Sequence, residues 1–205
     1  MFRNFEQVKK IENCMQKAEL QIIFHLLQDK ACAGKTIREI AEIAGVSVGS
    51  VHSTLAAIKE QGYLIDKGDT RVLRKRDKLI DRWARGYAET LKRKLFIGRF
   101  AFLTPEVRDQ WRDIVLPVSC AWGGEPAAAL QDGYLQPAEW SIYAADNANA
   151  LISTGRMIPN PQGEIAVYKR FWSTDEMPLL VVYADLLATE DDRCIEAANR
   201  IKPLL

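Results

Sequence analysis

Apolar residues recur at helical spacing in the first third of the chain. One stripe lies in residues 15–28 and another in residues 48–58, and their members are Leu20, Ile23, Phe24 and Leu27, and then Val48, Val51, Leu55 and Ile58. Each spacing places its members on one face of a helix. The pattern therefore predicts two amphipathic helices whose marked faces are buried.

A third, shorter helix is predicted between these two. Thr36-Ile-Arg-Glu39 has the sequence of a capping box, so a helix should begin at Ile37 and continue to Ala44. Gly45 then stands where a helix end favours positive φ, and Ser47 is a suitable cap for the next helix. Two short helices joined by a tight turn are expected.

A hairpin and a long helix follow. Residues 63–66 and 71–73 flank Lys67-Gly68-Asp69-Thr70, which is typical of a β-hairpin and its tip. The long helix is predicted from an apolar stripe made of Leu79, Trp83, Tyr87 and Leu91.

The second half of the chain alternates between short strand-like and helix-like runs. Strands are predicted at 96–102, 140–145, 164–172 and 179–184, and helices at 104–115, 124–133 and 191–205. The predicted fold class is α+β, with a helical N-terminal module and a mixed α/β C-terminal domain. We expect three parts: a DNA-binding domain at 1–76, a basic linker helix at 77–95 and the α/β domain at 96–205.

The N-terminal elements resemble the winged helix-turn-helix domains of bacterial regulators over roughly residues 15–75. The resemblance rests on Val46-Ser47-Val48-Gly49-Ser50-Val51, a Val-Ser-x-x-x-Val pattern that opens the recognition helix in such domains. It implies binding of double-stranded DNA through the major groove. Some winged helices dock proteins instead, and this alternative stays open.

Candidate DNA contacts come from helix caps, the outer helix face and the hairpin. We expect them to be Thr36, Ser47, Gly49, Ser50, His52, Ser53, Lys67, Arg71, Arg74, Lys75 and Arg76. His52 and Ser53 are placed to reach base edges, and the basic residues beside the hairpin to contact phosphate. The recognition helix has no Arg or Lys before Lys59, so the bidentate guanine contact is not available from its N-terminal end.

Charge is distributed unevenly along the chain. Residues 1–95 hold 19 Lys and Arg against 12 Asp and Glu, a balance of +7, whereas residues 96–205 hold 9 against 15, a balance of −6. Residues 71–94 alone carry ten basic and three acidic side chains. A basic half favours a polyanionic partner, although scattered surface charge gives the same totals.

The segment Trp122-Gly123-Gly124-Glu125-Pro126 predicts a strand that turns sharply into a closely packed helix. Together with Gly-Tyr-Leu at 133–135, Ser-Ile-Tyr-Ala-Ala at 141–145, the turn at 159–163, Phe-Trp at 171–172 and the apolar run 178–189, it resembles AbiEi-type antitoxins of type IV toxin–antitoxin systems. The resemblance implies a repressor of its own operon. It also implies a nucleotidyltransferase-type toxin as functional partner, without a stable complex between the two.

An enzyme is the alternative interpretation, either nucleotidyltransferase-like or nuclease-like. The strand after Gly123-Gly124 offers one acid, Asp146, where two alternating carboxylates are needed for metal ions. Glu164 and Lys169 have the wrong spacing for a nuclease. A residual site is left only if Glu125, Asp146 and Asp185 converge, so we expect no enzyme activity, no cofactor and no metal.

Cysteine, histidine and hydropathy patterns exclude further classes. Cys14, Cys32, Cys120 and Cys194 lie far apart, and neither histidine has a cysteine nearby to complete a zinc site. No run of about 18 apolar residues and no signal-peptide pattern occurs, so we expect a cytoplasmic protein with reduced thiols.

Overall fold

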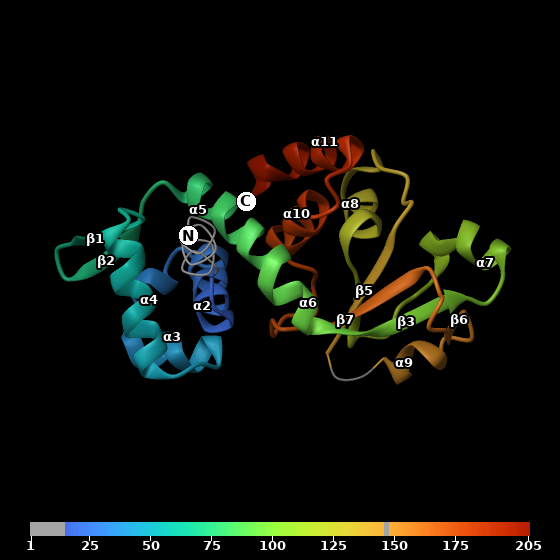
Figure 1. The fold of residues 1–205 in the computed structure, drawn as a ribbon, viewed down its shortest axis with the longest axis horizontal. Coiled ribbons are helices and arrows are strands. Elements are labelled where there is room, and N and C mark those ends of the chain that lie inside the picture. Colours follow the sequence, from blue (N-terminus) through green and yellow to red (C-terminus); the bar gives the residue numbers. More distant parts are fainter. Residues whose placement is uncertain (1–14, 146–147) are drawn as a thin grey trace, which may run out of the picture. The chain divides into compact units, whose positions relative to one another are not determined.

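A computed structural model describes residues 15–145 and 148–205. The chain divides into two compact units, residues 1–91 and 92–205. The division falls inside a helical stretch, because α5 (Arg76–Gly86), a π-helical turn (Tyr87–Leu91) and α6 (Lys92–Leu95) follow one another without a break (Figure 1). The helix predicted for residues 77–95 is therefore present.

The first unit contains four helices and one hairpin within its described residues. They are α2 (Lys17–Gln28), α3 (Ile37–Ala44), α4 (Val48–Glu60), the strands β1 (Leu64–Lys67) and β2 (Thr70–Leu73), and α5; a 3₁₀ turn covers Cys32–Gly34. Asp66 pairs with Arg71 across the antiparallel hairpin. The predicted order of elements in this part of the chain is confirmed.

The core of the first unit forms where α2, α3, α4 and α5 pack together. Phe24 of α2 lies 5.7 Å from Trp83 of α5 between ring centroids, and Trp83 stacks on Tyr87 at 5.1 Å. The indole nitrogen of Trp83 donates to the carbonyl of Leu20 at 2.8 Å, which satisfies the polar atom of a fully buried ring.

The prediction that Val48 belongs to the buried apolar face of α4 was wrong. Val48 is 50% exposed, and Thr54 is buried instead. The buried positions 51, 54, 55 and 58 follow the i, i+3, i+4, i+7 spacing, and Val48 is the first residue of the helix, beyond the packed turns.

The second unit is built on a five-stranded sheet in the order β4-β5-β7-β3-β6. Its strands are β3 (Phe96–Phe102), β4 (Cys120–Trp122), β5 (Trp140–Ala144), β6 (Met157–Pro159) and β7 (Ile165–Lys169). β5 and β7 are parallel, and the other pairs are antiparallel. Its helices are α7 (Pro105–Asp109), α8 (Gly124–Asp132), α9 (Asn149–Ile152), α10 (Leu179–Leu187) and α11 (Asp192–Ile201), with 3₁₀ turns at Trp111–Asp113 and Lys202–Leu204.

The two faces of this sheet differ in what they bury. Alternate residues such as Phe100, Ile142 and Val167 belong to an apolar core that includes Trp111, Trp122 and Trp140. On the other face, α8 packs against β5, and α8, α10 and α11 pack against one another (Figure 1). Ser141 and Tyr168 belong to this second face.

The prediction of a strand at 179–184 was wrong, because this segment is the helix α10. Residues Leu180 to Leu186 are all buried, so the helix is buried around its whole circumference, and apart from Asp185 its side chains show no alternation of polar and apolar faces. A continuous apolar run of this length fits a buried strand equally well.

Other differences concern the lengths of elements. The helix predicted at 104–115 is only α7 and a 3₁₀ turn, and the strand predicted at 164–172 is only Ile165–Lys169. The short elements α9 and β6 were not predicted.

Among the described residues, no single helix is long and apolar enough to cross a bilayer, and α3 and α4 reach that composition only as a pair bent by 108°.

Candidate nucleic-acid interface

The link between α3 and α4 sets the geometry of the first unit. The two helices meet at 108° across the three residues Gly45-Val46-Ser47. Gly45 has φ +62°, and the amide of Val46 donates to the carbonyl of Ala41 at 3.0 Å, which ends α3. An angle of about 90–120° with a short glycine-containing turn is that of a helix-turn-helix pair.

Both helices begin with a side-chain cap. The amide of Thr36 donates to the Glu39 carboxylate at 2.7 Å, and the amide of Glu39 donates to the Thr36 hydroxyl at 3.3 Å, so the predicted capping box is confirmed. Ser47 Oγ accepts from the amide of Ser50 at 3.1 Å. Thr36 and Ser47 therefore stabilise the N-terminal ends of α3 and α4. This role is separate from the DNA contacts predicted for both residues.

The outer face of α4 has small and hydroxyl-bearing side chains. Gly49, His52 and Ser53 are exposed and Ser50 is half-buried. Ser53 Oγ donates to the carbonyl of Ser50 at 3.1 Å, so this hydroxyl is left to act as an acceptor. Because the first amides of a helix have no intrahelical acceptor, the exposed start of α4 offers backbone donors to an anion.

Exposed cations lie at the tip of the hairpin and directly after its second strand. Lys67 at its tip and Arg74 and Lys75 at its end are exposed. Lys59 of α4 forms an ion pair with Asp66 of β1, which connects the helix to the hairpin. These exposed side chains suit contact with phosphate.

Two of the predicted DNA contacts also have partners within the unit. Arg71 donates to the carbonyl of Lys35, and Arg76 donates to the carbonyl of Leu27 at 2.6 Å; both side chains are half-buried. Each joins the hairpin region to a segment at least 36 residues away in sequence. No sequence pattern marks such pairs, because the acceptors are backbone carbonyls that every residue possesses.

Ion pairs further reduce the number of cations in residues 71–94 that are available for contact with phosphate. Arg82 pairs with Glu19 at 3.2 Å, and Lys92, the first residue of the second unit, pairs with Asp185 at 2.9 Å. The members that remain exposed are Arg74, Lys75, Lys78, Arg85, Arg93 and Lys94.

The conspicuous Trp122–Pro126 segment lies in the second unit and forms the predicted turn from β4 into α8. A Cβ on Gly123 would lie 2.5 Å from the ring of Tyr143, and Gly124 has φ +46°. The amide of Gly123 donates to the carbonyl of Ser141 at 2.9 Å. The glycines therefore let the start of α8 approach β5 closely, as expected from the sequence.

The other residues of this segment are packed inside the unit. Trp122 lies 5.5 Å from Trp111 and 6.0 Å from Trp140 between ring centroids, and Pro126 is buried. Glu125 is only 3% exposed, and its carboxylate accepts from the amide of Ala138 at 2.8 Å. Tight packing accounts for all these positions.

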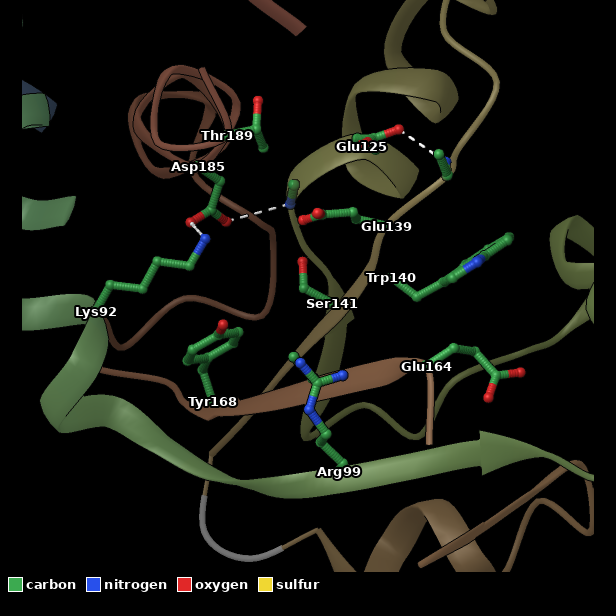
Figure 2. A pocket seen from close by; sticks show the side chains of 13 residues that line it. Lys92, Arg99, Glu125, Glu139, Trp140, Ser141, Glu164, Tyr168, Asp185 and Thr189 are labelled. Atoms are coloured by element: carbon green, nitrogen blue, oxygen red, sulfur yellow. Dashed lines mark hydrogen bonds and ion pairs between the residues drawn. The ribbon is translucent and has the colours of Figure 1, made fainter. Parts of the chain in front are cut away.

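A buried carboxylate joins four elements beside this turn (Figure 2). Asp185 of α10 accepts from Lys92 Nζ at 2.9 Å, from the Tyr143 hydroxyl at 2.9 Å and from the amide of Gly124 at 3.2 Å. Burial is the largest single influence on the pKa of Lys92 and lowers it, but Asp185, Tyr168 and Glu139 together outweigh burial and raise the pKa above its ordinary value. The signal that marks this site is one acid inside an apolar run, since a buried charge requires partners.

The structure describes only two of the three residues of the residual catalytic site considered from the sequence. Glu125 and Asp185 line one cavity, but both carboxylates are engaged as described, and Asp146 lies outside the described residues. Among the described residues, no group of three His, Cys, Asp or Glu side chains is arranged to hold a metal ion. Cys32, Cys120 and Cys194 are buried free thiols, and Cys14 lies outside the described residues.

Residues 71–204 match the protein family described as transcriptional regulator, AbiEi antitoxin, type IV toxin–antitoxin system. The match covers more than half of the chain. This chain belongs to that family. No curated protein and no solved structure matches it.

Membership of the AbiEi antitoxin family applies to the second unit and to the region from β2 onward. The match begins at residue 71, so it includes the Trp122–Pro126 segment and leaves out α2, α3, α4 and β1. The AbiEi antitoxin resemblance drawn from residues 122–189 is confirmed.

Proposed function

We propose that this type IV antitoxin regulator binds the double-stranded DNA of its own promoter and represses its operon. The observation that carries the proposal is the pair α3 and α4, which meet at 108° and leave an exposed face of small and hydroxyl-bearing side chains on α4. A hairpin with exposed cations follows. This is the arrangement expected of a winged helix-turn-helix, with α4 in the major groove and the hairpin as wing.

Base reading and phosphate contact fall to different residues in this proposal. His52 reaches base edges from the second turn of α4, and Ser53 accepts a hydrogen bond there. Lys67, Arg74 and Lys75 contact phosphate, together with the first amides of α4. Because α4 has no Arg or Lys before Lys59, a large share of the affinity should come from phosphate rather than from bases.

The proposed partner beyond DNA is a nucleotidyltransferase-type toxin encoded in the same operon. Family membership supports a toxin partner, and the AbiEi resemblance supports control of that toxin without a stable complex. A repressor that binds chromosomal DNA works in the cytoplasm. We propose no catalytic function for the second unit, because no described feature favours the nucleotidyltransferase or nuclease alternative.

The test is a titration of the full chain onto labelled DNA from upstream of its gene. With about four phosphate contacts, the association constant should fall roughly a hundredfold between 50 and 200 mM salt, since the slope of log K against log salt is about −0.9 per contact. Scrambled DNA of the same length is the control and should bind more weakly at every salt concentration. No binding at low salt, or binding that salt leaves unchanged, rejects the proposal.

A further inference from the structure

The second unit contains a cavity of about 200 Å³ on the sheet face opposite its apolar core. Its floor is a row of directly paired residues, Arg99 of β3, Ala166 of β7 and Ser141 of β5. The start of α8 and the end of α10 supply its other walls, with Glu139 reaching in from the segment before β5 (Figure 2). Drug-sized ligands occupy roughly 300–1,000 Å³, so this volume suits a smaller molecule.

Most charged groups in the wall of this cavity already have partners. Lys92 and Asp185 neutralise each other at 2.9 Å, and Glu125 accepts from the amide of Ala138. Glu164 accepts from the amide of Phe102 at 3.4 Å, and its side chain points away from the centre of the cavity (Figure 2). Arg193 also lies 3.9 Å from the Glu125 carboxylate, so three of these four groups have a partner of opposite charge and the fourth, Glu164, is directed elsewhere.

Arg99 and Glu139 are different, because each brings to the same space a charge without an ion-pair partner; Glu139 attracts Lys92 only from a greater distance. Both are exposed, and neither forms an ion pair with any residue of 15–145 or 148–205. Arg99 donates one Nη1 bond to the carbonyl of Gly163 at 2.9 Å, which fixes the side chain but leaves further guanidinium donors. The cavity thus offers one cation and one anion from different walls.

The remaining surface is partly aromatic and partly hydroxyl-bearing. The Tyr168 ring lies 5.5 Å from Tyr143 and 5.8 Å from Phe96 between centroids, so it is held in one orientation by its neighbours. Ser141 and Thr189 add hydroxyl groups to the wall. Apolar ligand atoms can rest on the ring and on Ala166, while polar atoms meet the hydroxyls.

We propose that this cavity binds a small zwitterion with one carboxylate and one ammonium group, the chemistry of a free α-amino acid. Arg99 takes the carboxylate through paired N–H donors, and Glu139 takes the ammonium group. A nucleotide or a free phosphate is disfavoured because the Glu139 carboxylate would repel a doubly charged anion held by Arg99. The residues of this cavity all belong to the second unit and the proposed DNA contacts to the first, so the two proposals fail separately.

The experiment measures binding of each standard L-amino acid to the full chain by calorimetry, without DNA. Each amino acid that binds is compared with two probes, the amine that lacks its carboxylate and the carboxylic acid that lacks its ammonium group. The wild-type chain should bind the amino acid at least tenfold more tightly than either probe. Arg99→Gln should abolish the preference over the amine, and Glu139→Gln the preference over the acid.

Glu164→Gln is the matched control, because it removes a carboxylate from the same cavity that points elsewhere, and it should leave binding unchanged. Arg99→Lys keeps the cation and should retain part of the preference that Arg99→Gln loses. If no amino acid binds at millimolar concentration, or if the Arg99→Gln and Glu139→Gln variants bind as the wild type does, the proposal is overturned. Equal binding of the carboxylic acid and the amino acid also overturns it.

Discussion

Gly123 shows how a single residue positions several others. Its missing side chain allows the ring of Tyr143 to lie against the backbone where α8 begins. The hydroxyl of Tyr143 in turn donates to the buried carboxylate of Asp185, which also accepts from the amide of Gly124. A side chain at position 123 therefore disturbs packing and a buried hydrogen-bond network together.

We predict that Gly123→Ala lowers the free energy of unfolding by about 1–3 kcal/mol, the usual effect of overpacking a core. The added Cβ would lie 2.5 Å from the Tyr143 ring and 2.9 Å from Ser141 Oγ. Gly98→Ala is the matched control, because no atom lies within 4 Å of its added Cβ. Urea unfolding of the three chains measures the difference, and equal losses for both variants would contradict the packing argument.

Glu39 provides a pH-dependent contribution at the start of α3. Hydrogen bonds from the Thr36 hydroxyl and the Thr36 amide lower the pKa of Glu39 below its ordinary value of 4.5. A lowered pKa in the folded state means that the stabilisation is fully present above about pH 4.5 and is lost as pH falls through the folded-state pKa.

Glu39→Gln should therefore be less stable than the wild type at pH 7, and the difference should shrink as the pH falls below about 4.5 and through the lowered pKa of the folded state. The measurement is the free energy of unfolding in urea at a series of pH values from 7 to 3. Glu42→Gln changes an exposed glutamate of the same helix that forms no cap, and serves as the control. A difference that stays constant across this range would show that the charge of Glu39 does not matter.

Residues whose role depends on near neighbours in sequence were predictable, and those with distant partners were not. The Thr36–Glu39 capping box and the positive φ of Gly45 follow from local sequence, and both are present. Arg71 and Arg76, which we expect to contact phosphate, also donate to carbonyls 36 and 49 residues away, and these bonds were not predicted. Such pairs exist only once the tertiary fold is formed.

The same distinction holds for whole elements. Amphipathic helices such as α2 and α4 can be recognised from sequence because one face is buried and apolar while the other faces water and is polar. This difference between the two faces creates the periodic pattern. The helix α10 is buried on every side, so its sequence carries no such contrast and was misassigned as a strand. The cavity residues come from β3, β5, β7, α8 and α10, and sequence alone does not bring them together.

The elements α4 and the β1–β2 hairpin should fail differently when their DNA contacts are removed. His52→Ala should reduce the preference for operator over random DNA, while Lys67→Ala with Arg74→Ala should weaken binding to both about equally. Arg76 is left intact because its bond to the carbonyl of Leu27 stabilises the fold. Equilibrium titrations on both DNAs measure the two effects, and the reverse pattern would show that α4 does not enter the groove.

At the scale of the whole molecule, the net charge of each half says less about phosphate contact than the positions of the exposed cations do. The balance of +7 over residues 1–95 includes Lys92, which is paired with Asp185 in the second unit. Residues 15–91 alone hold 13 Lys and Arg against 10 Asp and Glu, a balance of +3. The case for phosphate contact therefore rests on the exposed cations around the hairpin rather than on net charge.

The last prediction concerns the second unit, which we expect to be catalytically inert. A metal-dependent transferase or nuclease needs carboxylates that are free to bind ions. The two candidate carboxylates of the described residues have other partners, because Glu125 accepts from the amide of Ala138 and Asp185 from Lys92 Nζ, the Tyr143 hydroxyl and the amide of Gly124. Their positions are those of structural acceptors.

The measurement is incubation of the full chain with Mg²⁺ or Mn²⁺, nucleoside triphosphates, and RNA or DNA, followed by analysis for transfer or cleavage. We expect none above the level of a boiled control. Glu125→Ala should instead lower the free energy of unfolding by about 1–3 kcal/mol, because the amide of Ala138 loses its acceptor, and Glu125→Gln should cost less because it keeps one. Activity in the wild type that disappears in a correctly folded Glu125→Gln chain would make this carboxylate catalytic and overturn the prediction.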